Sequence, residues 1–454
     1  MLTSINPATG DPIGQYEETA PEEVMRRLEK ARGAFETWRR TDFSERAALM
    51  KAVSRLLIEN RSEYARTMAI EMGKPVKSGR AEIEKCAWAC EYYAEHAEKM
   101  LRPEIVRTDA RKSYVTYQPL GVILAIMPWN YPFWQVFRHA APGLMAGNGV
   151  ILKHASNVPG CAVAIGDIFK NAGLPEDLFQ NFLISSREAE GLIEHPNISA
   201  VTLTGSKAAG KAVAAKAGKM LKKTVLELGG SDPYIVLEDA DLDKTVETCV
   251  ASRLLNSGQS CIAAKRFVVV EKVLKRFEAM LVDQMQSKKM GDPFDEANEI
   301  GPQARADLRD DLHRQVAQSI VKGARCLLGG KIPAGKGSFY PPTVLSEVAK
   351  GMPAYDEETF GPVAAIIPAK DEKEAIQVAN DSTFGLGAAI FTRDTDHGEH
   401  IAANDLQAGN CFVNAFVKSD PRLPFGGVKQ SGYGRELSEY GLKEFVNIKT
   451  VYVN

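Results

Sequence analysis

Apolar residues recur at helical spacing through the first hundred residues of the chain. One such repeat runs through Val24, Leu28, Ala31, Phe35 and Trp38. These positions lie three or four residues apart and therefore form a single face of a helix. The same spacing returns between Ile83 and Ala94, and a Thr-x-x-Glu sequence at 19–22 predicts a capping box ahead of the first repeat. We expect the chain to begin with packed helices.

From residue 104 onward the pattern changes to strand-forming residues. The segment 105–117 carries β-branched and aromatic side chains on both sides of a polar turn at 108–111, which predicts a hairpin. The end of the chain, 445–453, alternates polar and apolar residues in the same way. We expect these two pieces to pair in a small sheet whose exposed edge meets another subunit.

Beyond residue 121, short apolar runs alternate with helical segments. The first strands expected are Gly121–Met127, Gly149–Lys153, Leu178–Leu183, Ala200–Thr204 and Thr224–Glu227. The other elements expected are strands at 234–237, 266–270, 363–368, 388–391 and 409–413 and helices at 163–171, 207–217, 242–255 and 274–286. Continuous apolar strands that alternate with helices are typical of parallel sheets covered on both faces, so the pattern predicts an α/β fold.

Composition and charge narrow the class of protein. The chain has 454 residues, and 56 Lys and Arg against 58 Asp and Glu leave a net charge of −2. This balance, without long blocks of one sign, argues against an electrostatic nucleic-acid partner. No apolar run approaches the ~20 residues of a membrane span, and the first residues show no signal peptide. Neither nucleic acid nor membrane is an expected partner.

Seven cysteines are scattered along the chain, at positions 86, 90, 161, 249, 261, 326 and 411. Their odd number and irregular spacing predict free thiols in a reducing compartment, so we expect a cytoplasmic protein. Cys86 and Cys90 lie one helical turn apart, but no second Cys or His pair accompanies them at ligand spacing. No metal site is predicted.

Three segments place polar groups where parallel sheets bind ligands. Residues 201–210 read as a strand, a glycine turn and a helix, which presents free backbone N–H groups to an anion. Glu227 ends a buried strand, where a raised pKa suits a general base. Prolines hold Asn130 in a loop after the first strand, from which its amide can donate to an oxyanion. Taken singly, each segment also fits an ordinary turn or strand end.

Cys261 differs in its surroundings from the other cysteines. It follows the polar, glycine-containing turn Asn256–Ser260, whereas Cys161 and Cys326 have apolar neighbours. A nucleophilic thiol needs such an accessible place. No histidine is close in sequence, so by itself the segment also fits an inert buried thiol.

Together these segments resemble the NAD(P)-dependent aldehyde dehydrogenases in their order and spacing. Further matching stretches are Asn6–Gly10, Lys153, Glu357–Pro362, Pro424–Gly427 and Ser431–Glu436. The resemblance covers essentially the whole chain and is closest to the short, NADP-type succinate-semialdehyde dehydrogenases. It implies the aldehyde-dehydrogenase fold, with a cofactor-binding domain at 1–104 and 122–229, a catalytic domain at 230–435 and oligomerisation strands at 105–121 and 443–454.

The resemblance also implies catalytic roles. Cys261 is expected to attack the aldehyde carbon, and the thiohemiacetal then transfers hydride to the nicotinamide and leaves a thioester. Glu227 is expected to activate water for deacylation. The Asn130 side chain and the Cys261 backbone N–H would form the oxyanion hole. His139 stands where many relatives have a lysine tied to proton relay, and residues 262–264 hold no second cysteine for a local disulfide switch.

For the cofactor, the resemblance implies NADP⁺ or NAD⁺. The residues expected to bind it are Trp129, Asn130, Lys153, His154, Ala155, Ser156, Gly205, Ser206, Leu228, Glu358 and Phe360. NAD enzymes of this family usually carry a glutamate three residues after the lysine, where this chain has Ser156. The missing carboxylate removes repulsion toward a 2′-phosphate. We expect NADP⁺ to be preferred, the alternative being a site without preference.

Arg138 and Ser419 are the residues expected to bind the substrate. In this family the helix after the oxyanion loop faces the substrate tunnel, and an arginine there suits a carboxylate. The resemblance therefore implies oxidation of succinate semialdehyde to succinate by a homodimer or homotetramer. The alternatives are a structural salt bridge for Arg138, another carboxylated or aliphatic aldehyde, a hydrolase that uses Cys261 and Glu227, and a non-catalytic binding protein.

Overall fold

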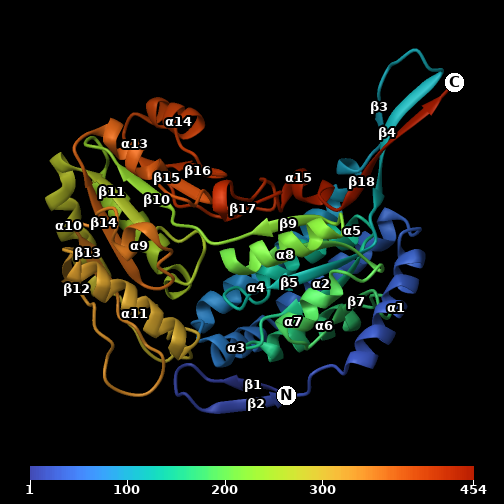
Figure 1. The fold of residues 1–454 in the computed structure, drawn as a ribbon, viewed down its shortest axis with the longest axis horizontal. Coiled ribbons are helices and arrows are strands. Elements are labelled where there is room, and N and C mark those ends of the chain that lie inside the picture. Colours follow the sequence, from blue (N-terminus) through green and yellow to red (C-terminus); the bar gives the residue numbers. More distant parts are fainter.

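The computed structural model describes all 454 residues, and its two large sheets occupy opposite halves of the molecule (Figure 1). The first sheet has six strands in the order β17-β9-β8-β5-β6-β7. These are β5 (Val122–Met127), β6 (Gly149–His154), β7 (Phe179–Asn181), β8 (Ile198–Thr204), β9 (Lys223–Glu227) and β17 (Gly432–Tyr433). β5 to β9 are parallel, as their buried apolar runs predicted, and β17 alone runs antiparallel, beside β9.

Helices surround this first sheet. They are α1 (Pro21–Trp38), α2 (Phe43–Glu59), α3 (Arg61–Met72), α4 (Val76–Met100), α5 (Trp134–Met145), α6 (Pro159–Asn171), α7 (Ser186–Leu192) and α8 (Lys207–Lys219). The predicted face of α1 is buried at every position, and α1 packs against β5, β6 and β7. α4 packs against α2, α3 and α5. Through these contacts α4 packs the N-terminal helices against α5, the helix that follows β5.

The second sheet has seven strands in the order β12-β13-β14-β11-β10-β15-β16. Its strands are β10 (Pro233–Val236), β11 (Arg266–Val270), β12 (Arg325–Leu328), β13 (Thr343–Ser346), β14 (Val363–Ala369), β15 (Gly387–Phe391) and β16 (Asn410–Val413). Its helices are α9 (Leu242–Leu254), η1 (Leu255–Gly258), α10 (Glu271–Gln286), α11 (Ala306–Val321), α12 (Pro353–Asp356), α13 (Glu372–Asn380) and α14 (Thr395–Asn404). The α/β class is thus confirmed for both halves.

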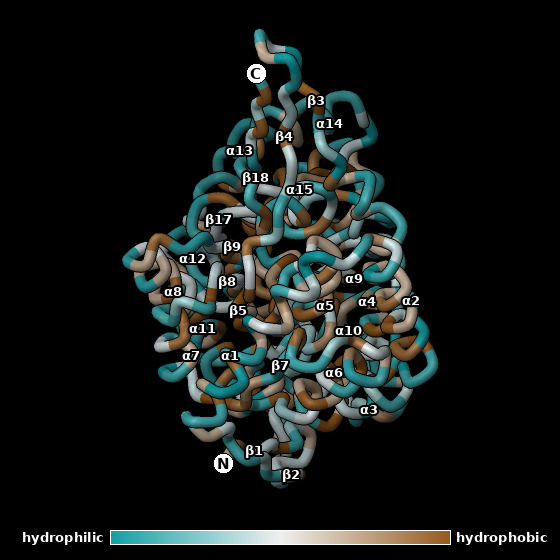
Figure 2. The backbone as a smooth tube through the Cα atoms, turned by 90° about the vertical axis from the view of Figure 1, so that its right-hand side faces the viewer, coloured by the Kyte–Doolittle hydropathy of each residue, from teal (hydrophilic) through white to brown (hydrophobic).

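Two small sheets lie at opposite ends of the molecule. β1 (Leu2–Ile5) pairs with β2 (Pro12–Tyr16) beside the N-terminus. β4 (Lys112–Pro119) lies between β3 (Glu104–Ile105) and β18 (Val446–Val453), all antiparallel, and this arm projects from the body with the C-terminus at its tip (Figures 1 and 2). The arm confirms the predicted pairing of two distant segments. None of the helices combines the length and apolar character needed to cross a membrane.

Two features near the sheets differ from the sequence expectations. The capping box at 19–22 is wrong, because α1 begins after Ala20 and the Thr19 hydroxyl instead accepts a hydrogen bond from Leu183 N–H at 3.2 Å. β17 was not expected, since two residues carry no periodicity. It follows η2 (Lys429–Ser431) and precedes α15 (Ser438–Lys443), and so brings the C-terminal segment against the end of β9.

Candidate active site

Cys261 follows a backbone segment in an unusual conformation. Asn256, Ser257 and Gly258 in η1 have φ values of 54°, 57° and 77°, all in the left-handed region. Gly258 is required there, because a Cβ atom would lie 2.2 Å from the backbone of Gly361. Non-glycine residues with left-handed φ values are strained, and they keep this conformation only where the packing around them holds it. The segment is therefore held by the structure around it and presents Cys261 at its end.

Lys265 fixes this segment through hydrogen bonds to its backbone. Its buried ammonium donates to the carbonyl oxygens of Ser260 at 2.9 Å and Cys261 at 2.7 Å, and it lies 3.6 Å from a carboxylate oxygen of Glu358. Glu358 in turn accepts a hydrogen bond from Gly230 N–H at 3.0 Å. This network fixes the backbone of the nucleophile relative to the predicted cofactor residue Glu358.

Asn130 is tied directly to the same segment. Its Nδ2 donates to the carbonyl of Gln259 at 3.1 Å, while Nδ2 of Asn256 donates to the carbonyl of Asn130 at 2.7 Å. A side-chain amide has two N–H donors, so one of those on Asn130 remains available. The backbone N–H of Cys261 also has no partner within the protein. These two donors are the pair expected to face an oxyanion.

The surroundings of Cys261 favour the protonated form of its thiol. Burial raises its pKa to about 12, although Arg138 and Lys265 pull the pKa downward. The carboxylates of Glu358 and Glu227 oppose those two cations and raise the pKa. Two fixed cations thus stabilise a thiolate at Cys261, whereas desolvation by burial disfavours it.

Glu227 lies at the end of β9, as predicted, and is buried. Neither carboxylate oxygen has a hydrogen-bond partner within the protein. Burial raises its pKa well above the usual range, against a lowering by Arg138. Gly426 of the matching 424–427 stretch packs against it, since a Cβ there would lie 2.8 Å from Oε1. An unpartnered carboxyl with a raised pKa is suited to accept a proton from water.

Arg138 on α5 forms a buried ion pair with Glu436. It also donates from Nη2 to the Thr204 hydroxyl at 3.2 Å, and its guanidinium lies 4.9 Å from the centre of the Phe425 ring. The salt bridge that the sequence left as an alternative therefore exists. Because Arg138 also lines a cavity that reaches Cys261, the pairing does not remove it from the site.

The next residue, His139, is buried against Phe445, with the two rings 5.0 Å apart. Burial lowers the pKa of His139 to about 3, so the ring is neutral at ordinary pH. It therefore carries no exchangeable charge where many aldehyde dehydrogenases have the relay lysine.

Two cavities meet at Cys261. One, of about 220 Å³, is lined by Trp129, Asn130, Gly205, Ser206, Leu228, Glu358 and Phe360, all predicted to bind the cofactor. The other, of about 470 Å³, is lined by Arg138 and Ser419, both predicted to bind the substrate. Cys261 lines both cavities. The structure thus gathers residues from distant parts of the chain on two sides of one thiol.

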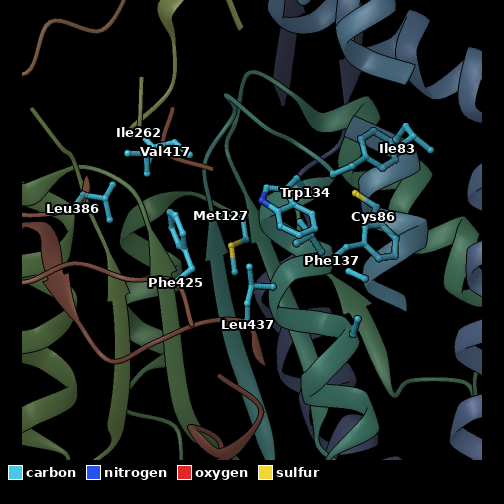
Figure 3. Close-up of a cluster of buried hydrophobic side chains, with 14 of the residues drawn as sticks. Ile83, Cys86, Met127, Trp134, Phe137, Ile262, Leu386, Val417, Phe425 and Leu437 are labelled. Atoms are coloured by element: carbon cyan, nitrogen blue, oxygen red, sulfur yellow. The ribbon is translucent and has the colours of Figure 1, made fainter. Parts of the chain in front are cut away.

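The larger cavity has an aromatic and basic wall. Trp134, at the start of α5, packs among Ile83, Cys86 and Phe137, while Ile262 and Val417 lie across from it (Figure 3). Lys85 on α4 lies over the Trp134 ring, with Nζ 4.4 Å from the ring centre, and donates to the Ser419 hydroxyl at 2.7 Å. Lys85 is half-buried, and no sequence argument singled it out.

The smaller cavity has the features of a dinucleotide site. Gly205 and Ser206 follow β8 at its carboxyl end, and the Ser206 hydroxyl caps α8 through Ala209 N–H at 3.3 Å. Nearby on β6, the Lys153 side chain is only 6% exposed and has neither an ion-pair partner nor a side-chain hydrogen bond. A buried lysine without a partner calls for an anion, so these residues fit a phosphate-bearing cofactor.

His154 and Ser156, which follow Lys153, have different surroundings. The His154 ring contacts the carbonyl of Pro132 at 2.9 Å and accepts from Ala155 N–H, and burial lowers its pKa to about 4. His154 therefore anchors the loop that carries Asn130. Ser156 is exposed and lines a third cavity of about 600 Å³, together with the N-terminal strand and Arg305.

Sequence reasoning missed four residues of the site: Lys85, Glu82, Lys265 and Glu436. Glu82 pairs with Lys74 and accepts from the backbone N–H groups of Phe133 and Trp134 at 2.9 Å, which fixes the start of α5. Glu436 belongs to the matching stretch 431–436, so its motif was visible but its partner was not. Charged residues on apolar helix faces were the one available signal for Lys85 and Glu82.

Comparisons with known proteins agree with this geometry. The profile of the aldehyde dehydrogenase family matches residues 1–451. A probable succinate-semialdehyde dehydrogenase of the NADP(+) type from Synechocystis sp. is 48% identical over 452 residues, covering 100% of this chain and 99% of the relative. A succinate semialdehyde dehydrogenase of the NAD(P)+ type from Escherichia coli is 48% identical over 449 residues, covering 99% of this chain and 97% of its own.

A solved structure has nearly the same fold as this chain. The succinic semialdehyde dehydrogenase from Streptococcus pyogenes, crystallised with NADP+ as the cofactor, superimposes with a TM-score of 0.98 at 37% identity. The match covers 100% of both chains.

Proposed function

Since this chain belongs to the aldehyde dehydrogenase family, we propose that it oxidises succinate semialdehyde to succinate with NADP⁺. The observation that carries the proposal is the position of Cys261 between two cavities, one with basic and hydroxyl groups on its wall and one that reaches Gly205 and Glu358. The names of the related proteins support the choice of substrate and cofactor.

The chemistry begins at Cys261. The Cys261 thiol gives its proton to water, its Sγ bonds to the aldehyde carbon, and the π pair of the C=O bond moves to the oxygen, which gives the thiohemiacetal anion. The oxygen of this intermediate lies between Nδ2 of Asn130 and the backbone N–H of Cys261, the two available donors. The smaller cavity would hold NADP⁺, whose nicotinamide would take the hydride from this carbon, so that the acyl group would remain as a thioester on Cys261.

Glu227 completes the reaction. Its carboxylate accepts a proton from water, whose oxygen bonds to the thioester carbon. The C–S bond then breaks, so that succinate leaves and the thiol is restored. The raised pKa of Glu227 brings proton exchange closer to neutral pH, and the lack of a hydrogen-bond partner leaves both oxygens open to water.

Lys153 and Ser156 form the basis of the proposed preference for NADP⁺. The unpaired ammonium of Lys153 is available to the 2′-phosphate, and no carboxylate stands at position 156 to repel it. Ser156→Glu is expected to lower kcat/KM for NADP⁺ at least about tenfold while changing that for NAD⁺ little, whereas Ser156→Ala is the neutral control. A wild-type enzyme with a strong preference for NAD⁺ would contradict this assignment.

We further propose that the protein works as a homodimer or homotetramer in the cytoplasm, with a cofactor-binding unit at 1–104 and 122–229 and a catalytic unit at 230–435. The arm supports assembly, because Ile105 and Ile448 on it are 78% and 63% exposed. All seven cysteines are free, which supports a reducing compartment.

The test is to measure the oxidation rates of a panel of aldehydes with each cofactor. The absorbance of the reduced cofactor reports the rate. Succinate semialdehyde and butanal form the central pair, since they have the same carbon number and differ in the terminal carboxylate. We expect kcat/KM for succinate semialdehyde to exceed that for butanal at least about tenfold, the effect of one charge-assisted contact. Equal values, or ester hydrolysis without cofactor reduction, would overturn the proposal.

A further inference from the structure

We propose that Lys85, with Ser419, holds the carboxylate end of the substrate and sets the preference for carboxylated aldehydes. This inference rests on the proposed function and names the residue that makes the larger cavity specific. It depends on which positive charge in that cavity is free to bind an anion.

Most cations on the cavity wall already have a carboxylate partner. Lys74 is paired with Glu82, Arg422 lies 2.7 Å from Asp420, and Arg138 is paired with Glu436. Their charges are largely compensated before a substrate arrives.

Two lysines of the wall remain without such a partner. Lys418 is exposed, so water screens its charge. Lys85 is half-buried and has no carboxylate within ion-pair distance. It is therefore the only sheltered cation of the cavity without a paired carboxylate, and Asp420 and Glu82 act on it only from beyond ion-pair distance.

The contacts of Lys85 leave it ready to bind a carboxylate. Its one hydrogen bond goes to the Ser419 hydroxyl at 2.7 Å, and an ammonium has three N–H donors. The Trp134 ring, 4.4 Å away, covers one side of Nζ and limits where it can move. A carboxylate between Lys85 and Ser419 would accept hydrogen bonds from both.

The electrostatic state of Lys85 agrees with an anion site. Burial, and then the neighbouring Arg138, lower its pKa to about 8. A bound carboxylate would remove the penalty that the unpaired ammonium now carries. The substrate would therefore gain more from Lys85 than from the paired Arg138, whose guanidinium must be shared with Glu436.

The test is Lys85→Met, which keeps the length of the side chain and removes its charge. With succinate semialdehyde and NADP⁺, we expect kcat/KM to fall at least about 20-fold, mainly through a higher KM, because one charge-assisted contact is lost. With butanal, kcat/KM should stay within about threefold, since no contact is lost. Lys77→Met, an exposed lysine on the same helix, is the matched control and should behave as wild type.

A second measurement separates binding from turnover. Succinate is expected to protect the Cys261 thiol of the wild-type protein from alkylation, and to protect the Lys85→Met variant much less. Lys85→Arg should recover part of the preference, since it restores the charge. These results together would support Lys85 as the anchor.

Other outcomes overturn the inference. If Lys85→Met loses both aldehydes equally, Lys85 is structural, and if it keeps the wild-type preference, the anchor is elsewhere. A wild-type protein without preference between the two aldehydes would instead contradict the proposed function. In that case the protection by succinate still decides whether Lys85 binds a carboxylate.

Discussion

At the scale of single residues, burial sets the chemistry of the site. Burial raises the pKa of both Cys261 and Glu227, and Arg138 lowers the pKa of both. Arg138 thus favours the charged form of both the proposed nucleophile and the proposed base. Lys265 acts on Cys261 in the same direction while it holds the backbone of the loop.

The raised pKa of Cys261 predicts how its reactivity depends on pH. In the cofactor-free protein, alkylation of Cys261 by iodoacetamide should rise about tenfold per pH unit from pH 7 to 10, because the thiolate is a minor form below a pKa of about 12. Peptide mapping by mass spectrometry measures the rate at this cysteine alone. Lys265→Met should slow it at every pH, since a stabilising cation is removed. A rate that levels off near pH 7 would contradict this account.

At the scale of elements, the site is built where strands end. β5 leads to Asn130, β8 to Gly205 and β9 to Glu227, so three of the functional groups follow from the order of parallel strands. The fourth group, Cys261, depends on η1, whose left-handed residues belong to no regular element.

This dependence predicts a large effect at Gly258. Gly258→Ala should destabilise the protein by about 2 kcal/mol or more and lower kcat, because alanine is strained at this φ and its Cβ collides with the backbone of Gly361. Thermal unfolding and steady-state kinetics measure both effects. Gly33→Ala is the control, since this exposed glycine within α1 has nothing within 4 Å and the change should be neutral or stabilising. Unchanged stability and kcat in Gly258→Ala would show that η1 tolerates other conformations.

The sequence was informative where local pattern decides the structure. Apolar runs predicted most strands of both sheets but not β12 and β13, and alternation predicted the pairing of β4 with β18. It was not informative where distant segments meet. β17 exists only because β9 offers an edge, and the N-terminal strands β1 and β2 carry too few apolar residues to be recognised.

The same division applies to the site residues. Cys261, Glu227 and Asn130 lie in recognisable motifs, whereas Lys85 lies within an ordinary amphipathic helix. Helical periodicity shows which face of α4 is buried, but it does not show that Ser419 and Trp134 face it. Which cations lack a carboxylate partner also depends on ion pairs between distant segments, such as Arg138 and Glu436.

At the scale of the whole molecule, the arm is the feature that a monomer leaves unexplained. It carries exposed apolar side chains, and its outer strands have unpaired edges. Cys261 lines two cavities that contain no residue of the arm, so the proposed assembly surface is separate from the proposed active site.

The arm predicts that a single charge can change the assembly. Ile448→Asp should shift the protein toward a monomer of 49.6 kDa, because it places a carboxylate on the proposed contact surface. Analytical ultracentrifugation measures the mass. Ile58→Asp on α2, also exposed, should leave the assembly unchanged. A wild-type protein that is already monomeric would contradict the proposed role of the arm.

The central claim is that Cys261 carries the acyl group of the substrate until Glu227 activates water. Mass spectrometry of the Glu227→Gln variant after mixing with succinate semialdehyde and NADP⁺ tests it most directly. We predict a succinyl thioester on the Cys261 peptide, formed with one equivalent of reduced cofactor and followed by turnover at least about 100-fold slower than in wild type. No adduct, or an adduct on another cysteine, would contradict the account.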